Sequence, residues 1–244
     1  MIQKIKVGAV SYLNAKPLLY GLKHTDIIKE IVLTEDYPSN IAHQLLHGTI
    51  DIGLVPVAII PKLQEHYIIS NYCIGCDGEV ASVCLFSEVP IEQIKKVLLD
   101  YQSRTSVRLV QILLKEYWKV DVVFEQTSTN FREEIKNTTA AVVIGDRAFE
   151  QRNISTYCYD VGLAWKQHTG LPFVFAAWVA NKPLNEDFIA RFSAANQLGL
   201  DDIETVIHQL HSPHYNLKKY FTQNIQYVLN NNLKKGLAHF LEKI

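Results

Sequence analysis

The chain has 244 residues, of which 48% are hydrophobic and 20% are charged, and its formal net charge is −1. This composition is typical of a folded protein with one or two compact lobes, and it argues against disorder. Nucleic-acid binding is not expected, because phosphate contacts need clustered Lys and Arg and the chain has no long basic run.

The N-terminal segment and the cysteines indicate in which cellular compartment the protein is expected. The segment MIQKIKVGAV has no apolar stretch of signal-peptide length, and no apolar run approaches the roughly 20 residues that span a bilayer. Cys73, Cys76, Cys84 and Cys158 are expected to be reduced thiols. We therefore expect a cytoplasmic protein without a membrane contact.

Short strands alternate with helices in the first part of the chain. Strands are predicted at 4–10, 30–33 and 51–55, and helices at 14–22, 39–47 and from 57 to about 63. Ser39 is the expected N-cap of the second helix, and Gly48 its C-terminal stop. Such βαβ alternation predicts a mostly parallel sheet with right-handed crossovers.

Successive strands follow at 72–87, and a second α/β series begins at 97–99. Its further elements are a helix at 105–118, a strand at 122–124, a helix at 130–137, a strand at 140–144, a helix after Gly145 and a long strand at 172–180. From residue 185 onward only helices are predicted, at 186–198, 202–210, 217–229 and 233–243.

This order predicts two α/β lobes, the second inserted into the first. Residues 1–86 and 176–244 form the first lobe, and residues 87–175 form the second. Two strand crossovers would form the hinge. A ligand is expected in the cleft between the lobes, where the carboxyl ends of parallel strands face each other.

The segment DYQSRTS at 100–106 lies between a predicted strand and a long helix. Its Ser103, Thr105 and Ser106 can cap the free N–H groups of the helix, and the same N–H groups can bind a carboxylate. In isolation the motif favours a plain cap. Its position, where the inserted lobe would face the cleft, favours a ligand site.

Other polar residues also follow predicted strands. Ser11 and Asn14 come after the first strand, and Asn14 either donates its amide to a ligand or caps the next helix. Gly145 admits a close backbone approach, whereas Asp146 is expected to cap its helix, because a bare carboxylate would repel an anion. Ser82 lies at the predicted crossover between the lobes, and its hydroxyl is a candidate for exposure in the cleft.

Metal and nucleophile motifs are weak. Cys73 and Cys76 form a C-x-x-C without a second such pair, and the pair His43 and His47 lacks the H-E-x-x-H pattern. The chain contains no P-loop, G-x-S-x-G or G-x-G-x-x-G motif. No metal or organic cofactor is expected, and the residues alone indicate a two-lobed binder of a small anion.

Taken together, several segments resemble the chorismate dehydratase family of the futalosine route to menaquinone. They are VGAVSYLNAKPLLYGL at 7–22, GTIDIGLVPV at 48–57, GEVASVCLFS at 78–87, LLDYQSRTSVRLVQILL at 98–114, VVIGDRAF at 142–149 and YDVGLAWKQHTGLPFVFAAWVA at 159–180. Glu79 departs from the family pattern, in which a proline is expected before the V-x-S-V strand.

The resemblance implies a periplasmic-binding-protein-like fold of type II and a small-molecule substrate, chorismate. The implied products are 3-[(1-carboxyvinyl)oxy]benzoate and water, formed without a cofactor. The candidate substrate contacts are Ser11, Asn14, Ser82, Ser103, Arg104, Thr105, Ser106, Gly145, Asp146 and Thr169. Asn14 is the expected catalytic residue.

Two roles remain open for the proton acceptor. In the first, the enolpyruvyl carboxylate of the substrate takes the C3 proton while Asn14 holds the reacting geometry; in the second, Asp146 is the general base. Two other functions also remain: a non-catalytic small-anion solute-binding protein, and the related 1,4-dihydroxy-6-naphthoate synthase. The sequence does not indicate an oligomeric state.

Overall fold

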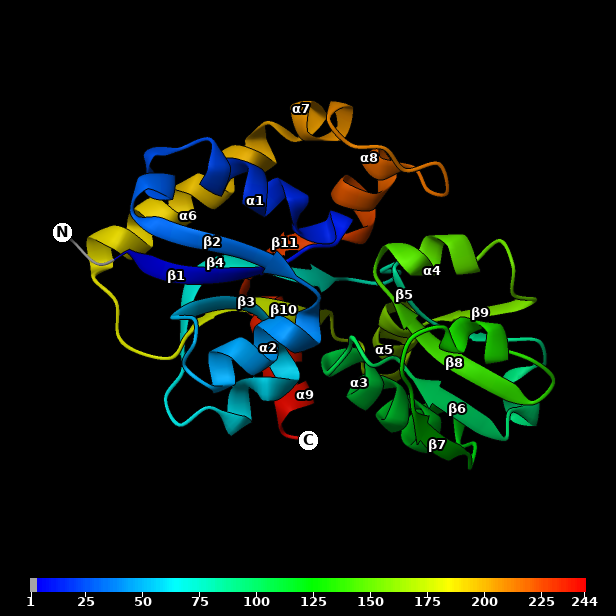
Figure 1. Cartoon of the computed structure of the whole chain (residues 1–244). Helices are drawn as coiled ribbons and strands as arrows, with labels where there is room; N and C mark the ends of the chain where they lie inside the picture. Colours follow the sequence, from blue (N-terminus) through cyan, green and yellow to red (C-terminus); the bar gives the residue numbers. More distant parts are fainter. Residues whose placement is uncertain (1–3) are drawn as a thin grey trace.

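Two mixed β-sheets, each with its own helices, lie side by side in the computed structural model, which describes residues 4–244 (Figure 1). One sheet has six strands in the order β11-β4-β10-β3-β1-β2, and the other has five in the order β7-β6-β8-β5-β9. The predicted α/β class with two lobes is thereby confirmed.

The six-stranded sheet combines strands from both ends of the chain. Its strands are β1 (Ile5–Val10), β2 (Ile31–Asp36), β3 (Ile52–Pro56), β4 (Tyr67–Cys76), β10 (Phe173–Ala180) and β11 (Gln226–Val228). β1 pairs in parallel with β2 and β3, whereas β10 runs antiparallel to β3 and β4. The late strand β10 therefore returns the chain to the centre of the first sheet.

The five-stranded sheet is built from the middle of the chain. Its strands are β5 (Val83–Ser87), β6 (Lys96–Leu99), β7 (Val123–Gln126), β8 (Thr139–Ile144) and β9 (Tyr157–Asp160). β6 is parallel to β7 and β8, and β5 is antiparallel to β8 and β9.

Helices and short helical turns connect and cover these strands. The α-helices are α1 (Lys16–Lys23), α2 (Pro38–Leu46), α3 (Thr105–Leu113), α4 (Asp146–Gln151), α5 (Val161–Thr169), α6 (Glu186–Asp201), α7 (Ile203–His208), α8 (Leu217–Lys219) and α9 (Asn231–Leu241). The 3-10 turns are η1 (Leu13–Ala15), η2 (Asp26–Lys29), η3 (Val57–Lys62), η4 (Ile91–Gln93) and η6 (Phe131–Glu134), and the π-helical turns are η5 (Leu114–Trp118) and η7 (Tyr220–Asn224). Among residues 4–244, no helix combines the length and the apolar character needed to cross a bilayer.

Local sequence explains where several helices begin, end and pack. Pro17 occupies the first turn of α1, where its missing N–H costs nothing. Gly48 follows α2 with a φ of +67°, the left-handed conformation that ends helices at glycine. Gly21 of α1 and Gly199 of α6 let these helices touch, because a Cβ on Gly21 would lie 1.7 Å from the Ala195 carbonyl oxygen.

The core is formed by strands that are apolar along their whole length. Every residue of β3 and of β10 is buried, as expected for strands covered on both faces. Trp178 of β10 is fully buried and donates its indole N–H to Asn196 at 2.9 Å. Burying a large apolar side chain contributes about 1.5–3 kcal/mol to the stability of the fold. The buried strands β3 and β10 therefore form a stable centre from which the loops of the site extend.

Some local predictions are wrong. Ser39 is not an N-cap, because α2 begins one residue earlier at Pro38 and Ser39 is buried inside the helix. The predicted helix at 130–137 is only the short turn η6. The segment 217–229 breaks after η7 and ends in β11, since Ile225 is extended and Gln226–Val228 pair with β4. Strand β9 and helix α5 were not predicted.

The chain crosses between the two sheets twice. The first crossing lies between β4 and β5, at 77–82, and the second between α5 and β10, at 170–172. β5 thus pairs within the five-stranded sheet, and β10 enters the six-stranded sheet at Phe173. The predicted lobe limits, 1–86 with 176–244 and 87–175, stay a proposal, and the strand pairing favours a shift of both limits by a few residues.

Candidate functional site

A cavity with about 490 Å³ of empty space, part of it open to solvent, lies between the two sheets. Its polar lining comes from Asn14, from Gly145 and from residues 103–106. Val10, Ile74, Val83 and Phe175 contribute apolar surface. A concave apolar site with a few convergent polar groups is the usual form of a small-molecule site.

The 103–106 turn begins helix α3 at the wall of the cavity. The Ser103 hydroxyl oxygen accepts the Ser106 N–H at 3.1 Å and so satisfies a free N–H of the first helical turn. The N-cap position itself is occupied by Arg104, whose side chain makes no capping bond. The Thr105 hydroxyl accepts the Ala58 N–H of η3 at 3.2 Å. Ser103, Thr105 and Ser106 are all buried and all line the cavity, so these hydrogen bonds and the ligand-facing position coexist.

Arg104 differs from its neighbours in this turn. It is exposed, and its guanidinium donates to the carbonyl oxygens of Tyr101 and Ser103, at 3.2 and 3.0 Å. It lines the cavity and also a neighbouring outer groove. Arg104 therefore supplies positive charge where the cavity meets that groove.

The outer groove runs along the exposed face of α3 and is rich in cations. Arg108 and Lys115 lie on one side, and Lys62 and Lys243 approach from the six-stranded side. Ser103 and Arg104 belong to both the cavity and the groove. Glu116 also lines the groove, but the positive side chains of the groove are more numerous. An excess of one charge sign raises the local concentration of oppositely charged ligands, so the groove favours the approach of anions.

Asn14 does not cap a helix. Helix α1 has no side-chain cap, and the Asn14 side-chain oxygen is buried without a hydrogen-bond partner among the described residues. The Asn14 backbone oxygen accepts the Tyr227 hydroxyl at 2.9 Å, which holds the backbone in place. Since buried polar atoms are rarely left without a partner, this oxygen is a strong candidate for a ligand contact.

Gly145 needs its glycine for two reasons. Its φ is +67°, and a Cβ there would lie 2.6 Å from the Tyr12 ring. A side chain at this position would therefore strain the backbone and displace Tyr12. Gly145 donates its N–H to the Ser82 carbonyl oxygen at 2.9 Å. Because Gly145 has no side chain, the cavity is lined by backbone atoms at this position.

Asp146 joins the two halves of the molecule. The prediction that Asp146 caps α4 is wrong, because its side chain makes no capping bond there. Its carboxylate accepts the Leu13 N–H of the other lobe at 3.0 Å instead. Asp146 does not line the cavity. Burial raises the pKa of Asp146, and the Leu13 N–H, Lys16 and Arg147 partly oppose that rise. In this conformation Asp146 is an interlobe contact.

Ser82 is fully buried at the crossover, and its exposed-hydroxyl interpretation does not describe this structure. The Tyr220 hydroxyl donates to the Ser82 hydroxyl oxygen at 2.6 Å. Tyr220 lies in η7, far along the chain, and is itself fully buried. Ser82 lies beneath the cavity wall, between the lining residues Val80 and Val83.

Ser11 and Thr169 lie away from the cavity lining. Ser11 is half-buried and donates its backbone N–H to the Asp36 carbonyl oxygen. The Thr169 hydroxyl donates to the Trp165 carbonyl oxygen at 2.9 Å and accepts the Leu171 N–H at 3.1 Å. Thr169 therefore ends α5 and shapes the turn before β10.

Two further residues of this region, Tyr12 and Arg147, were not identified from the sequence. Tyr12 lines the cavity, donates to the Gln102 side-chain oxygen across the interlobe gap, and has a pKa that burial raises. Arg147 forms an ion pair with the fully buried Asp100 at 2.7 Å and lies 3.5 Å from the Tyr12 hydroxyl. Tyr12 lies inside the segment 7–22 that carries the family resemblance, so that segment was the available signal.

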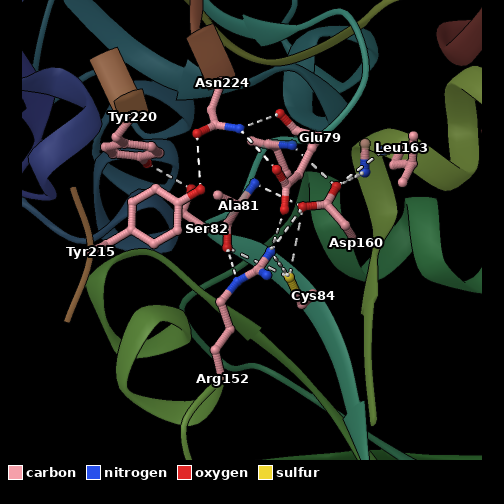
Figure 2. A network of polar contacts seen from close by, with 12 residues as sticks. Glu79, Ala81, Ser82, Cys84, Arg152, Asp160, Leu163, Tyr215, Tyr220 and Asn224 are labelled. Carbon is pink, nitrogen blue, oxygen red and sulfur yellow. Dashed lines mark hydrogen bonds and ion pairs between the residues drawn. The ribbon is translucent and has the colours of Figure 1, made fainter. Parts of the chain in front are cut away.

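A second polar cluster holds the crossover at 77–82, as Figure 2 shows. The Asp160 carboxylate accepts four backbone N–H groups, two from the crossover at Val80 and Ala81 and two from the start of α5. Arg152 pairs with Asp160 at 3.2 Å and donates to the Ala81 carbonyl oxygen at 2.8 Å. We call Asp160, Arg152 and the residues that they bind the crossover network.

Glu79, the departure from the family pattern, belongs to this crossover network. Its side chain lies 3.5 Å from the Arg152 guanidinium, and both its backbone and side-chain oxygens accept the Asn224 amide. Ala81 has a φ of +66°, an uncommon conformation for a residue with a Cβ. Polar contacts of Glu79 thus hold the loop in which the family pattern places a proline.

The cysteine and histidine pairs form no metal cluster. Cys73 and Cys76 are buried in β4, and burial raises the pKa of Cys73 to about 12. Residues 4–244 contain no group of three or more His, Cys, Asp or Glu side chains placed to hold a metal ion. His43 and His47 stack on the surface of α2, and His208, His211 and His214 are exposed.

Two sequence comparisons relate this chain to proteins of menaquinone biosynthesis. A family model described as menaquinone biosynthesis matches residues 5–244. A chorismate dehydratase of Thermus thermophilus is 24% identical, and the match covers 98% of this chain and 94% of that protein.

Solved structures are similar in fold at lower identity. A protein of Archaeoglobus fulgidus is 14% identical with a TM-score of 0.78, over 98% of this chain and 96% of that one. The periplasmic aliphatic sulphonate binding protein of Escherichia coli is 15% identical with a TM-score of 0.63, over 98% and 85%. A Candida albicans protein with the generic periplasmic binding protein fold has a TM-score of 0.64 at 12% identity, over 98% and 89%. The predicted periplasmic-binding-protein-like fold is confirmed.

Proposed function

We propose that this chain, which belongs to the menaquinone biosynthesis family, removes water from chorismate. One observation carries the proposal: Asn14 from the six-stranded side and the 103–106 turn from the five-stranded side line the same cavity. These two segments belong to the motifs that resemble chorismate dehydratases. The similarity to the Thermus thermophilus enzyme supports the same reaction.

The proposed reaction breaks two bonds on the ring. The C3–H bond gives up its proton, and the C4–O bond releases hydroxide, which leaves as water with that proton. The ring becomes aromatic as 3-[(1-carboxyvinyl)oxy]benzoate. Because aromatisation supplies the thermodynamic drive, the protein must mainly orient the dianion and exclude water.

The charges around the cavity suit a substrate with two carboxylates. The start of α3 carries a partial positive charge and free N–H groups, which attract anions. Arg104 adds a full charge at the cavity edge. We propose that Ser103, Arg104, Thr105 and Ser106 bind one carboxylate, and that Asn14 and the Gly145 backbone bind the rest of the ring.

The geometry favours the substrate itself as the proton acceptor. Asp146, the alternative base, faces Leu13 outside the cavity lining, whereas proton abstraction requires a base within hydrogen-bond reach of the proton. In the proposed mechanism the enolpyruvyl carboxylate takes the C3 proton while Asn14 fixes the ring. Asn14 is the catalytic residue in this sense. We further propose a cytoplasmic location, in keeping with a biosynthetic role.

The decisive test is incubation of the purified protein with chorismate, followed by detection of the aromatic product. We expect turnover in the wild type, a loss of about 100-fold in kcat for Asn14→Ala, since misplacement of a substrate can cost this much, and kcat within about tenfold of wild type for Asp146→Asn. Asn14→Asp restores an oxygen acceptor but adds a charge, so we expect it to raise KM.

The outcomes separate the mechanisms and the competing functions. If Asp146→Asn abolishes turnover while chorismate still binds, Asp146 is the base and the substrate-assisted mechanism is wrong. Saturable chorismate binding without product identifies a solute-binding protein instead. If chorismate neither binds nor reacts, the later dihydroxynaphthoate synthase becomes the better assignment.

A further inference from the structure

We infer that Tyr12 is a positioning residue for the proposed dehydration, because its side chain bridges the two lobes and so brings Asn14 opposite the 103–106 turn. This inference rests on the proposed function and gives Tyr12 a role beyond lining the cavity. Tyr12 follows β1 of the six-stranded sheet, whereas the partners of its hydroxyl, Gln102 and Arg147, belong to the five-stranded side. We call the contacts of the Tyr12 hydroxyl with these two side chains the Tyr12 bridge.

The Tyr12 hydroxyl both donates and accepts a hydrogen bond across the gap. It donates its proton to the Gln102 side-chain oxygen, and it accepts an N–H of the Arg147 guanidinium, with 3.5 Å between Nη2 and the hydroxyl oxygen. The Gln102 NH₂ group donates to the Tyr101 hydroxyl at 2.8 Å, which leaves the Gln102 oxygen for Tyr12. A tyrosine hydroxyl has a single proton, so this arrangement uses that proton fully.

Asp100 holds both partners of Tyr12 in place. The Asp100 side chain is fully buried and accepts the Arg147 guanidinium at 2.7 Å and the Gln102 backbone N–H at 3.1 Å. It also accepts the Ile144 N–H at 3.1 Å, at the end of β8. Charge-assisted hydrogen bonds in a buried site are short and strong. The five-stranded lobe therefore presents a prepared binding place for the Tyr12 hydroxyl.

The Tyr12 ring also contacts the opposite lobe. A Cβ on Gly145 would lie 2.6–2.7 Å from three carbons of the ring, so the ring fits there only because residue 145 is a glycine. Burial raises the pKa of Tyr12 far above its ordinary value, so the hydroxyl keeps its proton and remains a donor. Both the ring and the hydroxyl of Tyr12 are thus bound by the five-stranded lobe.

Docking of Tyr12 sets the place of Asn14, two residues later. The Leu13 N–H between them is accepted by Asp146 at 3.0 Å, and the Ala15 N–H is accepted by the Tyr12 carbonyl oxygen at 3.1 Å. This turn therefore meets the five-stranded lobe at two successive residues just before Asn14. Because the 103–106 turn lines the same cavity from the five-stranded side, the site is complete only when the turn at 12–15 is docked.

The test compares Tyr12→Phe with a matched control, Tyr101→Phe. Both hydroxyls bond the Gln102 side chain, but Tyr101 does so within its own lobe. Tyr12→Phe removes a hydrogen bond between the lobes and keeps the ring, so we expect KM for chorismate to rise about five- to tenfold with kcat within about twofold. Tyr101→Phe should keep KM within about twofold. A wild-type KM in Tyr12→Phe, or an equal rise in both variants, would overturn the inference.

A double-mutant cycle with Gln102→Leu tests whether the two side chains act through one bond. If they do, Gln102→Leu alone raises KM about as much as Tyr12→Phe, and the double variant raises it no further. A rise equal to the product of the two single effects would mean that the residues act independently, against the Tyr12 bridge. Gln102→Leu also tests the bridge from the other lobe if Tyr12→Phe does not fold, and a wild-type KM in it would count against the inference.

Hydrogen exchange measured by NMR tests the Tyr12 bridge without turnover. Asp146 protects the Leu13 N–H only while the lobes are together, so its exchange should become about fivefold faster in Tyr12→Phe. The amides of the buried strand β10, and Leu13 in Tyr101→Phe, should exchange as in the wild type. Unchanged exchange at Leu13, or an equal rise in β10, would contradict the bridge.

The two kinds of measurement separate this inference from the proposed function. If the wild type makes no aromatic product from chorismate but the exchange at Leu13 changes as expected, the dehydration is wrong and the Tyr12 bridge between the lobes stands. If the wild type makes the product while KM and exchange in Tyr12→Phe match the wild type, only the role of Tyr12 is wrong.

Discussion

The two sheets are joined in two regions that are built differently. Around the cavity, single hydrogen bonds cross the gap, from Leu13 to Asp146, from Ser39 to the Gln102 carbonyl oxygen and from Ala58 to Thr105. We call these the cavity-side contacts. At the crossover network, by contrast, one buried carboxylate, Asp160, gathers four N–H groups and an arginine.

The difference indicates which region moves. A single hydrogen bond contributes a net 0.5–1.5 kcal/mol in typical proteins, so the cavity-side contacts are individually weak enough to break and re-form. The crossover network is dense, and it ties the chain segments that the two sheets share. We therefore expect the crossover to act as the fixed hinge and the cavity side to open for substrate and close over it.

The largest effect should come from removing Asp160. Asp160→Ala would leave Arg152 without its partner and four N–H groups without their acceptor, and breaking a buried pair costs about 3–5 kcal/mol. Urea denaturation monitored by circular dichroism measures the free energy of unfolding. The control is Asp146→Ala on the cavity side, with an expected loss below about 1.5 kcal/mol. Equal losses in the two variants would contradict the comparison.

Asp146→Ala should instead change substrate affinity. It removes the acceptor of the Leu13 N–H, one of the cavity-side contacts that we expect to form when the lobes close. Because a net hydrogen bond of about 1 kcal/mol corresponds to roughly a fivefold change in an equilibrium constant, we expect KM to rise about fivefold with kcat little changed. Steady-state kinetics with chorismate gives both values. A large fall in kcat at constant KM would instead assign Asp146 to the chemistry.

Ligand should compact the molecule if the cavity-side contacts form a closing interface. We expect the radius of gyration from solution scattering to decrease at saturating product or chorismate, and Asp146→Ala to need more ligand for the same decrease. Asp160→Asn, on the crossover side, serves as the comparison and should not shift the ligand requirement. Unchanged dimensions at saturation would argue against closure during the reaction.

The sequence predicted the strands and helices of each lobe better than the contacts between the lobes. The βαβ rhythm and the apolar runs placed most strands of both sheets, because periodic burial is a local property of the chain. Strand β11 was missed since its pairing with β4 depends on a partner more than 150 residues away. Helix α5 was missed although its cap, Asp160, is an ordinary N-cap residue.

The candidate site shows the same division. The loop ends at Asn14, at 103–106 and at Gly145 were predicted to converge, and they line one cavity. The function of each side chain in the site was not fixed by the sequence: Asp146 binds the opposite lobe, and Thr169 ends its own helix. Tyr220, the partner of Ser82, gave no signal, because a buried aromatic residue in a helical segment is usually part of the core.

The smallest expected effect concerns Glu116, which forms an ion pair on the surface between the two lobes. Glu116 of η5 pairs with Lys243, which follows α9, at 2.7 Å, and with His168 at 3.5 Å. The Lys243 ammonium holds the pKa of Glu116 below its ordinary value, with partial opposition from burial and further help from His168.

The sign of its pH dependence follows from that lowered pKa. A carboxyl group with a lower pKa in the folded state stabilises the fold at pH values above its unfolded pKa, near 4.3. That contribution is lost as the pH falls through the folded pKa. Glu116→Gln should therefore leave the urea midpoint almost unchanged at pH values below the folded pKa of Glu116 and lower it slightly at neutral pH. Exposed ion pairs contribute about 0–1 kcal/mol, so added salt should erase the difference. A larger, salt-insensitive loss at neutral pH would mean that this surface pair, and not the crossover network, holds the sheets together.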